Sequence, residues 1–565
     1  GGDNVAVGGE ALANNTTAND NTAVGKAALR VNTTGANNTG VGRKALEENT
    51  TGFQNVAVGA NALDANTTGG NCTALGMSSL SANTTANNNT AVGYNSLNSN
   101  TTASDNTAVG RSALFANTTG TNNTAVGMAA LDSNTTGSYN DAFGKHALSA
   151  NTTASANAAF GYKALEANTT GSENVAVGFE ALHKNTTGNR NIAVGTEALF
   201  NNTTGSNNTG IGDNALLSNT TSSYLTAVGH FALNESTGGS NTAVGANSMR
   251  YNTTGIANTA IGQDSLKSNT TGQYNTAVGH NALDTSQTAW YNTCVGVNAG
   301  QAITSGQRCV MIGHNAGVSS TTSNGLTIVG KSAGQANTTG YITAFGENAA
   351  HNHTTGDQNT ALGQGALYHV TTGSNNTAVG VNALSQSTAS HCTAMGRYAG
   401  MLNTTGNQNT SFGYMAGYHT TTGSNNTNIG SGAMPSANTS SNQFTLGDTA
   451  VSNLRCNDTS ISGLSDERDK TDIIDLPIGL DFINALKPRK FKWATRDGNI
   501  KDGKYRAGFI AQELQSLESS TSVDYLNLVI DENPDRLEAT EGHLLPVLIK
   551  AVQELSIKVT ALEAG

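Results

Sequence analysis

Charge and proline are both scarce in this chain. Charged residues make up 12% of the 565 positions, and the five prolines all lie at or beyond Pro435. Disordered chains are typically rich in both, so their scarcity argues against disorder. Because proline removes a backbone donor, its absence leaves every N–H before Pro435 available to a β-ladder. The composition, dominated by Gly, Asn, Thr and Ala, therefore favours a long β-structure.

Long apolar runs and a strong charge of either sign are also missing. No stretch is apolar over the 18 or so residues that a membrane-spanning helix needs, so no membrane span is expected. A formal net charge of −11 is modest for this length and argues against a nucleic-acid surface. No signal peptide is visible, and the chain opens at Gly1–Gly8, already inside a repeat unit. We expect an upstream segment that anchors the protein to a virion or cell.

The cysteines give no sign of a disulfide framework. There are five, an odd number, and they lie far apart. Cys72, Cys309 and Cys392 share one repeat position that usually holds Asn, and Cys294 occupies a second. This distribution favours small residues tolerated at repeat positions over disulfides or a metal site. No metal and no cofactor are predicted.

Glycine recurs at a fixed period through most of the chain. From Gly8 to Gly447 a glycine recurs every 17 residues, with three steps of 16, which makes 27 units. Their consensus is Asn-Thr-Ala-Val-Gly-x-x-Ala-Leu-x-x-Asn-Thr-Thr-Gly-x-x. A fixed period of this kind is typical of a repeat architecture, and 17 residues are too few for a helical hairpin repeat.

One unit fits one coil of a β-solenoid. Thr22–Val24 predicts a strand with Thr and Val on one face and Ala on the other, and Ala28–Leu29 predicts a second short strand. Gly25 and Asn32–Gly35 supply turn chemistry, since Gly and Asn tolerate positive φ. Residues 1–447 are therefore predicted to be a solenoid whose coils stack about 4.8 Å apart.

The predicted core of such a coil is thin. We expect each coil to bury one Val or Ile and one Leu, which hardly offsets the conformational entropy of ordering the coil. The Ala column then has no partner within its own coil and would pack against copies of itself in a homotrimer. The column includes Ala23, Ala57, Ala91, Ala108 and Ala125.

The repeat also resembles the head repeats of YadA-type trimeric autotransporter adhesins. The resemblance covers residues 1–447 and rests on Asn-x-Ala-Val/Ile-Gly in the units. It implies a left-handed β-roll joined as a trimer. The chain differs in its longer period and in its Asn-Thr-Thr-Gly turn, and it lacks the C-terminal membrane barrel of those adhesins.

Aromatic and basic residues interrupt the repeat in two regions, 290–314 and 391–419. Exposed aromatic side chains on a polar rod could stack on sugar rings of a receptor, or they could be local variation of the core or the trimer interface. The candidate receptor-binding residues are Trp290, Tyr291, Tyr398, Tyr414 and Tyr418. Nothing resembles the paired carboxylates of a glycosidase, so a depolymerising enzyme is not predicted.

Composition changes after the repeat. Residues 448–464 read as a short β-rich neck, and residues 465–565 as an ordinary charged domain. Within that domain, 476–486 has helical periodicity, 490–493 alternates as a strand, and 507–514 begins another helix. Residues 544–563 carry a heptad seam that predicts a trimerising coiled coil. The seam residues are Leu545, Leu548, Val552, Leu555, Val559 and Leu562.

This C-terminal region resembles the endosialidase-type intramolecular chaperone domain of phage tailspikes and tail fibres. The resemblance runs from Ser465 to about Leu562. It rests on four motifs in order: Leu-Ser-Asp through Lys at 464–470, Leu-Lys-Pro at 486–488, Gly-Phe-Ile-Ala-Gln-Glu at 508–513, and Leu-Ile-Lys-Ala-Val-Gln-Glu-Leu at 548–555. It implies a domain that trimerises, guides folding of the upstream β-structure and then cleaves itself before its first serine.

The cleavage chemistry can be written on named residues. A turn could bring the amine of Lys470 to the hydroxyl of Ser465, which would attack the carbonyl of Leu464. Asp466 or Arg468 could orient this pair. The alternative is that residues 465–467 simply cap a helix and the lysine is solvated.

Together these patterns predict a mostly β, trimeric phage tail fibre that attaches to a host glycan or protein receptor and is located on the virion tail. Its C-terminal domain would be a single-turnover self-cleaving serine peptidase with no external substrate. The alternative is a bacterial surface adhesin or extracellular filament subunit that uses the same chaperone.

Overall fold

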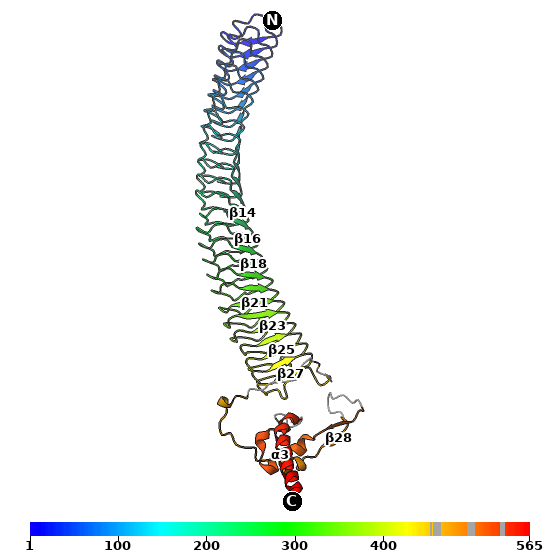
Figure 1. Cartoon of the computed structure of the whole chain (residues 1–565). Helices are drawn as coiled ribbons and strands as arrows, with labels where there is room; N and C mark the ends of the chain where they lie inside the picture. The colour runs from blue at the N-terminus through cyan, green and yellow to red at the C-terminus, as the bar shows by residue number, and fades with distance from the viewer. Residues whose placement is uncertain (452–454, 456–464, 494–502, 532–536) are drawn as a thin grey trace. The chain divides into compact units, whose positions relative to one another are not determined.

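The computed structural model describes residues 1–451, 455, 465–493, 503–531 and 537–565. These residues group into two compact units, Gly1–Tyr341 and Ile342–Gly565. Both units contain coils of a parallel β-solenoid, and the second also contains the C-terminal helices (Figure 1). The predicted neck at 448–464 lies largely outside the described residues.

Each coil contributes one short strand. The first unit holds β1 Val5–Val7, β2 Thr22–Val24, β3 Thr39–Val41, β4 Val56–Val58, β5 Thr73–Leu75, β6 Thr90–Val92, β7 Thr107–Val109, β8 Thr124–Val126, β9 Asp141–Phe143, β10 Ala158–Phe160, β11 Val175–Val177, β12 Ile192–Val194, β13 Thr209–Ile211, β14 Thr226–Val228, β15 Thr242–Val244, β16 Thr259–Ile261, β17 Thr276–Val278, β18 Thr293–Val295, β19 Val310–Ile312 and β20 Thr327–Val329. The second unit holds β21 Ile342–Phe345, β22 Asn359–Leu362, β23 Thr377–Val379, β24 Thr393–Met395, β25 Thr410–Phe412, β26 Thr427–Ile429 and β27 Phe444–Leu446.

Neighbouring strands pair in parallel and in register with the repeat. In the first unit Thr22, Ala23 and Val24 of β2 lie opposite Thr39, Gly40 and Val41 of β3, and the same register continues through β19 and β20. In the second unit it runs from β21 and β22 to β26 and β27. The predicted parallel solenoid with a 17-residue period is therefore confirmed.

The predicted second strand is wrong. Residues 26–31 of the β2 coil form turns, because Ala27 and Leu29 adopt left-handed conformations with φ of 60° and 50°. An extended segment cannot include such residues. The turn at Gly25 is as predicted, with φ of 135°, and a Cβ there would come within 2.4 Å of the Gly42 carbonyl oxygen.

The predicted core composition is right for the leucine, since Leu29 is fully buried, and wrong for the valine. The middle residue of the strand faces the coil interior, so Ala23 and its counterparts Ala57, Ala91 and Ala108 are fully buried within one chain. Val24 instead lies on the outer face beside Thr22 and is only partly buried. A coil this narrow has room for one Leu against two alanines, and a β-branched residue at the strand centre would overfill it. The Ala column is thus internal and cannot be the trimer surface.

Three coils show how closely the interior volume is matched. In β18 to β20 the inner strand position, usually alanine, holds the larger residues Cys294, Met311 and Ile328. In the same coils the turn leucine becomes glycine, as at Gly317, where an added Cβ would lie 2.6 Å from Met311 Sδ. A larger residue on one wall is offset by a smaller one on the other, as dense packing requires.

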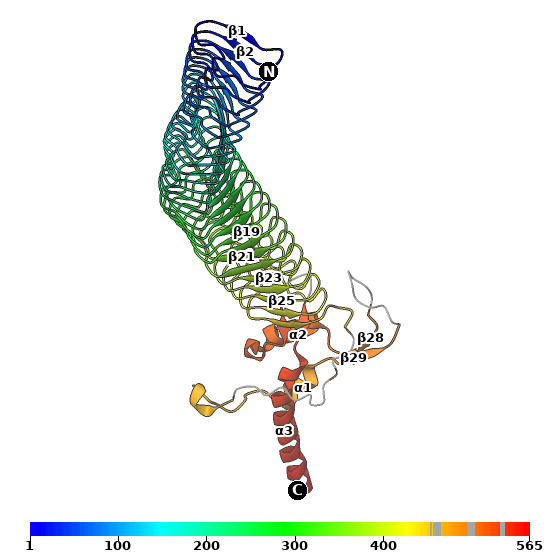
Figure 2. The same cartoon turned by 90° about the horizontal axis from the view of Figure 1, so that it is seen from above.

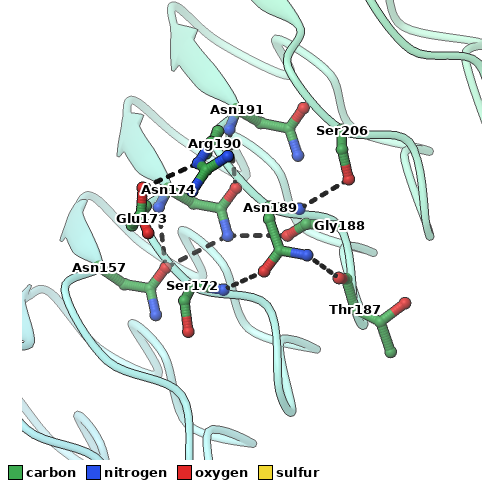
Figure 3. Close-up of polar contacts among 10 residues, drawn as sticks. All are labelled: Asn157, Ser172, Glu173, Asn174, Thr187, Gly188, Asn189, Arg190, Asn191 and Ser206. Carbon is green, nitrogen blue, oxygen red and sulfur yellow. Dashed lines mark hydrogen bonds and ion pairs between the residues drawn. The ribbon is translucent and has the colours of Figure 1, made fainter.

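A buried asparagine ladder joins the coils. The backbone N–H of Asn174 donates to Asn157 Oδ1 at 3.0 Å, and Asn191 donates to Asn174 Oδ1 at 2.9 Å (Figure 3). Asn174 Nδ2 also donates to the carbonyl of Gly188 at 2.9 Å. Each amide thus bonds both the coil before it and the coil after it, which satisfies polar groups that burial would otherwise leave without water.

A second ladder uses the Asn of the Asn-Thr-Thr turn. Asn134 Nδ2 donates to Asn117 Oδ1 and to the Gly137 carbonyl, both at 2.9 Å, and Asn134 Oδ1 accepts from Asn151 at 2.8 Å. This side chain mimics a turn and joins three coils. Ser286 interrupts the ladder, and it leaves Asn269 Oδ1 and its own hydroxyl buried without a hydrogen-bond partner.

The described cysteines are free and buried. Cys72 replaces an asparagine of the first ladder, and its backbone N–H still donates to Asn55 Oδ1 at 2.9 Å. Burial raises the pKa of its thiol to about 11, so the reactive thiolate is suppressed.

The C-terminal region of the second unit mixes short helices and strands. Its elements are η1 Glu467–Asp469, α1 Leu480–Ala485, β28 Arg489–Phe491, β29 Arg506–Gly508, α2 Ala511–Thr521, η2 Asp524–Leu526, β30 Val529–Ile530, β31 Glu538–Ala539, η3 Glu541–Leu544 and α3 Leu545–Glu563. The strand predicted at 490–493 and the helix predicted at 544–563 are present with small shifts. The helix predicted at 507–514 begins only at Ala511, because residues 506–508 pair with β28.

These elements share one apolar core. Phe482 of α1, Leu514 of α2 and Val547 of α3 are buried together with Leu526 and Leu528. Glu554 of α3 accepts the Leu480 N–H at 2.8 Å, so the long helix caps α1. Figure 2 shows α3 continuing past α1 toward the C-terminus, and its residues beyond Glu554 are exposed. Among the described residues, no helix is long and apolar enough to cross a membrane.

We predict that the asparagine ladder dominates local stability. Asn134→Ala should destabilise the flanking coils by about 2–4 kcal/mol, because it removes the donor to the buried Asn117 Oδ1 and one of the two acceptors of the buried Asn151 amide. Thr136→Ala, on the exposed edge of the same coil, should change stability by less than about 0.5 kcal/mol. Hydrogen exchange followed by mass spectrometry measures both, and equal protection in the two variants would refute the ladder's role.

A buried histidine predicts a local pH dependence. His353 occupies a ladder position with its Nε2 3.1 Å from Asn359 Nδ2, and burial lowers its pKa from 6.5 to about 4. The unfolded coil therefore binds more protons than the folded one between these values, so stability falls as pH drops through this window, by at most about 3 kcal/mol.

The matched pair is His353→Asn, which restores the repeat residue, and His391→Asn at an exposed position. Only His353→Asn should remove the loss of protection at pH 5 relative to pH 7 in peptides from this coil, after correction for intrinsic exchange rates. An unchanged pH dependence in that variant would contradict the assignment.

Candidate functional site

The start of the C-terminal domain brings the predicted serine and lysine together. Lys470 Nζ donates to Ser465 Oγ at 2.6 Å. The short helix η1 lies between them, and Lys470 ends it by donating its backbone N–H to the Glu467 carbonyl at 3.2 Å. The spacing of five residues therefore places the amine at hydrogen-bond distance from the hydroxyl, the geometry that a serine–lysine dyad needs.

Asp466 and Arg468 are paired with each other rather than with this dyad. Asp466 Oδ1 caps η1 by accepting the Arg468 N–H at 2.9 Å, and it accepts from Arg468 Nε at 3.0 Å. The guanidinium, followed by the capping N–H, lowers the pKa of the Asp466 carboxyl. Asp466 thus holds the turn between Ser465 and Lys470, so the predicted helix cap and a Ser465–Lys470 hydrogen bond are both present.

The dyad is exposed in the single chain. Ser465 and Lys470 both lie on the surface. A lysine becomes a general base when its ammonium is desolvated, because burial disfavours the charged form. The geometry for proton transfer is therefore present, whereas a dry environment would have to come from groups that cover the site. The predicted scissile residue Leu464 lies outside the described residues.

An apolar hollow of about 530 Å³ adjoins the lysine. It includes Ile473, Ile474 and Tyr525, which are 63%, 80% and 55% exposed. Isoleucines this exposed are unusual on a protein that functions as a monomer. They are not among the predicted site residues, although two adjacent isoleucines in a charged segment are a signal in the sequence.

The predicted heptad seam is exposed to solvent among the residues that the structure describes. Val547 and Ala551 of α3 face the domain core. The seam residues lie on the other side of the helix and are between 43% and 82% exposed. They are Leu545, Leu548, Val552, Leu555, Val559 and Leu562. An apolar stripe of this spacing is typical of a helix that packs against other helices.

The candidate receptor-binding aromatics fall into two groups. In the first unit Tyr291 stacks on Tyr274 with ring centroids 5.1 Å apart, and Trp290 is 44% exposed. In the second unit Arg397 lies over the Tyr398 ring, which meets Tyr418 edge-on at 6.3 Å. The alternative that they are core residues is wrong for Trp290, Tyr291 and Tyr414, whose exposed fractions are 44%, 52% and 50%.

Comparison with known proteins agrees with the C-terminal resemblance. Residues 465–520 match the family described as Chaperone of endosialidase. No curated protein and no solved structure matches the chain. The match begins at the dyad serine, and it indicates that a β-solenoid is followed here by an intramolecular chaperone domain. Neither the YadA-type resemblance of the repeats nor a phage origin gains support from these comparisons.

Proposed function

We propose that the chain is the shaft of a homotrimeric fibre, assembled by its own C-terminal chaperone. The observation that carries the proposal is the exposed heptad seam of α3 in a region that begins with a chaperone match. Three copies of α3 would bury their seams against one another while Val547 and Ala551 keep each helix joined to its own domain core.

A chaperone is useful because the shaft is repetitive. Asn157, Asn174 and Asn191 make the same hydrogen bonds in successive coils, so a chain shifted by one coil forms nearly the same ladder. Many registers therefore have similar free energies. The C-terminal domain has a core of unlike residues, which permits only one arrangement and can set three chains in step.

We further propose that the domain then cleaves itself before Ser465. The proton of Ser465 Oγ passes to Lys470 Nζ as the oxygen attacks the Leu464 carbonyl carbon. The C–N bond between these residues breaks, the serine nitrogen takes the proton, and water hydrolyses the resulting ester. Because both dyad side chains are exposed in the single chain, cleavage would follow assembly, when neighbouring chains exclude water from the lysine.

The finished fibre would serve attachment. A repetitive polar solenoid with exposed aromatic side chains at Tyr291, Trp290 and Tyr414 suits recognition of a cell-surface glycan or protein receptor. A phage tail fibre, anchored to the virion through an upstream segment, is the use we propose. A bacterial surface adhesin or filament subunit is the second candidate, favoured by the resemblance of the repeats to adhesin heads.

Cleavage is tested by comparing variants of the dyad. Ser465→Ala should leave a full-length band on denaturing gels, and Lys470→Ala should slow cleavage at least about 10²-fold, as loss of a general base does. Lys470→Arg keeps the charge but cannot be deprotonated, so it should also fail to cleave. Ser519→Ala, on the exposed surface of α2, should cleave normally. Cleavage before residue 465 in Ser465→Ala would exclude the mechanism.

Assembly is tested by two neighbouring substitutions on α3. Val552→Glu buries a charge in the seam and should reduce trimer formation at least about tenfold, whereas Gln553→Glu adds the same charge one residue away from the seam and should have little effect. Multi-angle light scattering gives the mass of each variant, and circular dichroism checks that α3 stays helical. A wild-type chain that remains monomeric would refute the trimer.

A further inference from the structure

One column of side chains on the solenoid is apolar without exception. It is formed by the third residue of the three-residue strands and the fourth residue of β21 and β22, and we name it the outer column. Its 27 members are Val7, Val24, Val41, Val58, Leu75, Val92, Val109, Val126, Phe143, Phe160, Val177, Val194, Ile211, Val228, Val244, Ile261, Val278, Val295, Ile312, Val329, Phe345, Leu362, Val379, Met395, Phe412, Ile429 and Leu446.

The outer column faces away from the interior of its own coil. Ile211, Ile261 and Phe412 are 38%, 42% and 52% exposed. The residue before each of them, which is a glycine, an alanine and a serine respectively, is buried. The neighbouring outward residues at the start of each strand are mostly threonine, and Asp141 is the only charged one among them. Monomeric proteins rarely expose a continuous apolar strip of this kind.

We infer that the outer column is the surface along which copies of this chain pack against one another over the length of the shaft. This inference rests on the proposed trimer and names its interface, which replaces the internal Ala column as the shaft's contact surface. The 20 members in the first unit alone reach the roughly 800 Å² per partner of a stable interface if each residue contributes about 40 Å².

A second copy fits this surface better than a different protein does. The column repeats with the period of the coils, and a second copy is a partner that presents the same period along the same length. Its lack of charge offers a foreign partner no electrostatic recognition, whereas like surfaces without charge can approach without repulsion. The unpaired seam of α3 provides a means of bringing the copies together with equal polarity.

The size of the residues in the column also marks register. Most members are valine, but Phe143 and Phe160 stack with ring centroids 4.8 Å apart, and Phe345 and Phe412 are 50% and 52% exposed. Copies shifted by several coils would set phenylalanine against valine and leave gaps or clashes. In copies that are in register, each phenylalanine lies at the level of the same phenylalanine in the neighbouring copy. These positions therefore preserve the alignment that the chaperone establishes.

The test measures whether the column is covered in the assembled protein. Single cysteines replace Ile261 of the outer column or Tyr224, which is 69% exposed at a coil edge, in full-length chains carrying Cys456→Ser. The four remaining native cysteines are buried. Both variants are treated with a water-soluble maleimide, and their oligomeric mass is measured in the same samples.

We expect Ile261→Cys to react at least about tenfold more slowly than Tyr224→Cys in the oligomer, since the centre of an interface is packed like a protein interior. As a second variant, Ile261→Asp should reduce the oligomeric mass or its resistance to heat, whereas Tyr224→Asp should not. Equal labelling rates in a confirmed trimer would overturn the inference and leave the proposed function intact. A monomeric wild-type chain would instead refute the proposed function.

Discussion

The structure depends on one interaction, the hydrogen bonding of each coil to an identical coil beside it. Strand residues pair with their own counterparts, and the buried amides of Asn157, Asn174 and Asn191 continue the pairing where the backbone turns. Since every coil is both donor and acceptor for its neighbours, stability grows with the number of coils rather than with the size of a central core. The same uniformity makes neighbouring registers nearly equal in free energy, so the interaction that stabilises the fold cannot by itself select it.

Selection has to come from a part of the chain that does not repeat. The C-terminal core joins Phe482, Leu514 and Val547 from three different helices, and Glu554 caps α1 from α3. No shifted arrangement satisfies such unlike contacts, in contrast to the shaft. A covalently attached domain of this kind is required once for each assembly, because a completed ladder can then persist through its slow unfolding. The cleavage proposed before Ser465 would remove the domain after use, which is consistent with that division of labour.

The period in the sequence was enough to predict a solenoid, its coil number and the turn at Gly25, because backbone stacking imposes strict repetition. It was not enough to decide which strand face is internal, since alternation defines two faces without ranking them. Hydrophobicity alone predicts that Val24 is a core residue. The interior position is instead taken by Ala23, because the coil is too narrow for a larger side chain there. The left-handed turn at Leu29 was also missed. Its signal was present at Gly300 and Gly317, where glycine replaces this leucine with nearly the same φ, 59° and 57°.

At the site, the spacing of five residues predicts that Ser465 and Lys470 can meet, and the short helix between them places the two side chains at hydrogen-bond distance. Spacing could not show that both side chains are exposed, since exposure depends on packing by the rest of the molecule. The seam of α3 and the outer column of the shaft are also exposed in the single chain, and both are apolar. One event, the proposed association of identical chains, would cover the two apolar surfaces and give the Ser465–Lys470 pair a dry environment. Association of identical chains would bury the leucines, cover the valines and desolvate the lysine, which links cleavage to correct assembly through water exclusion alone.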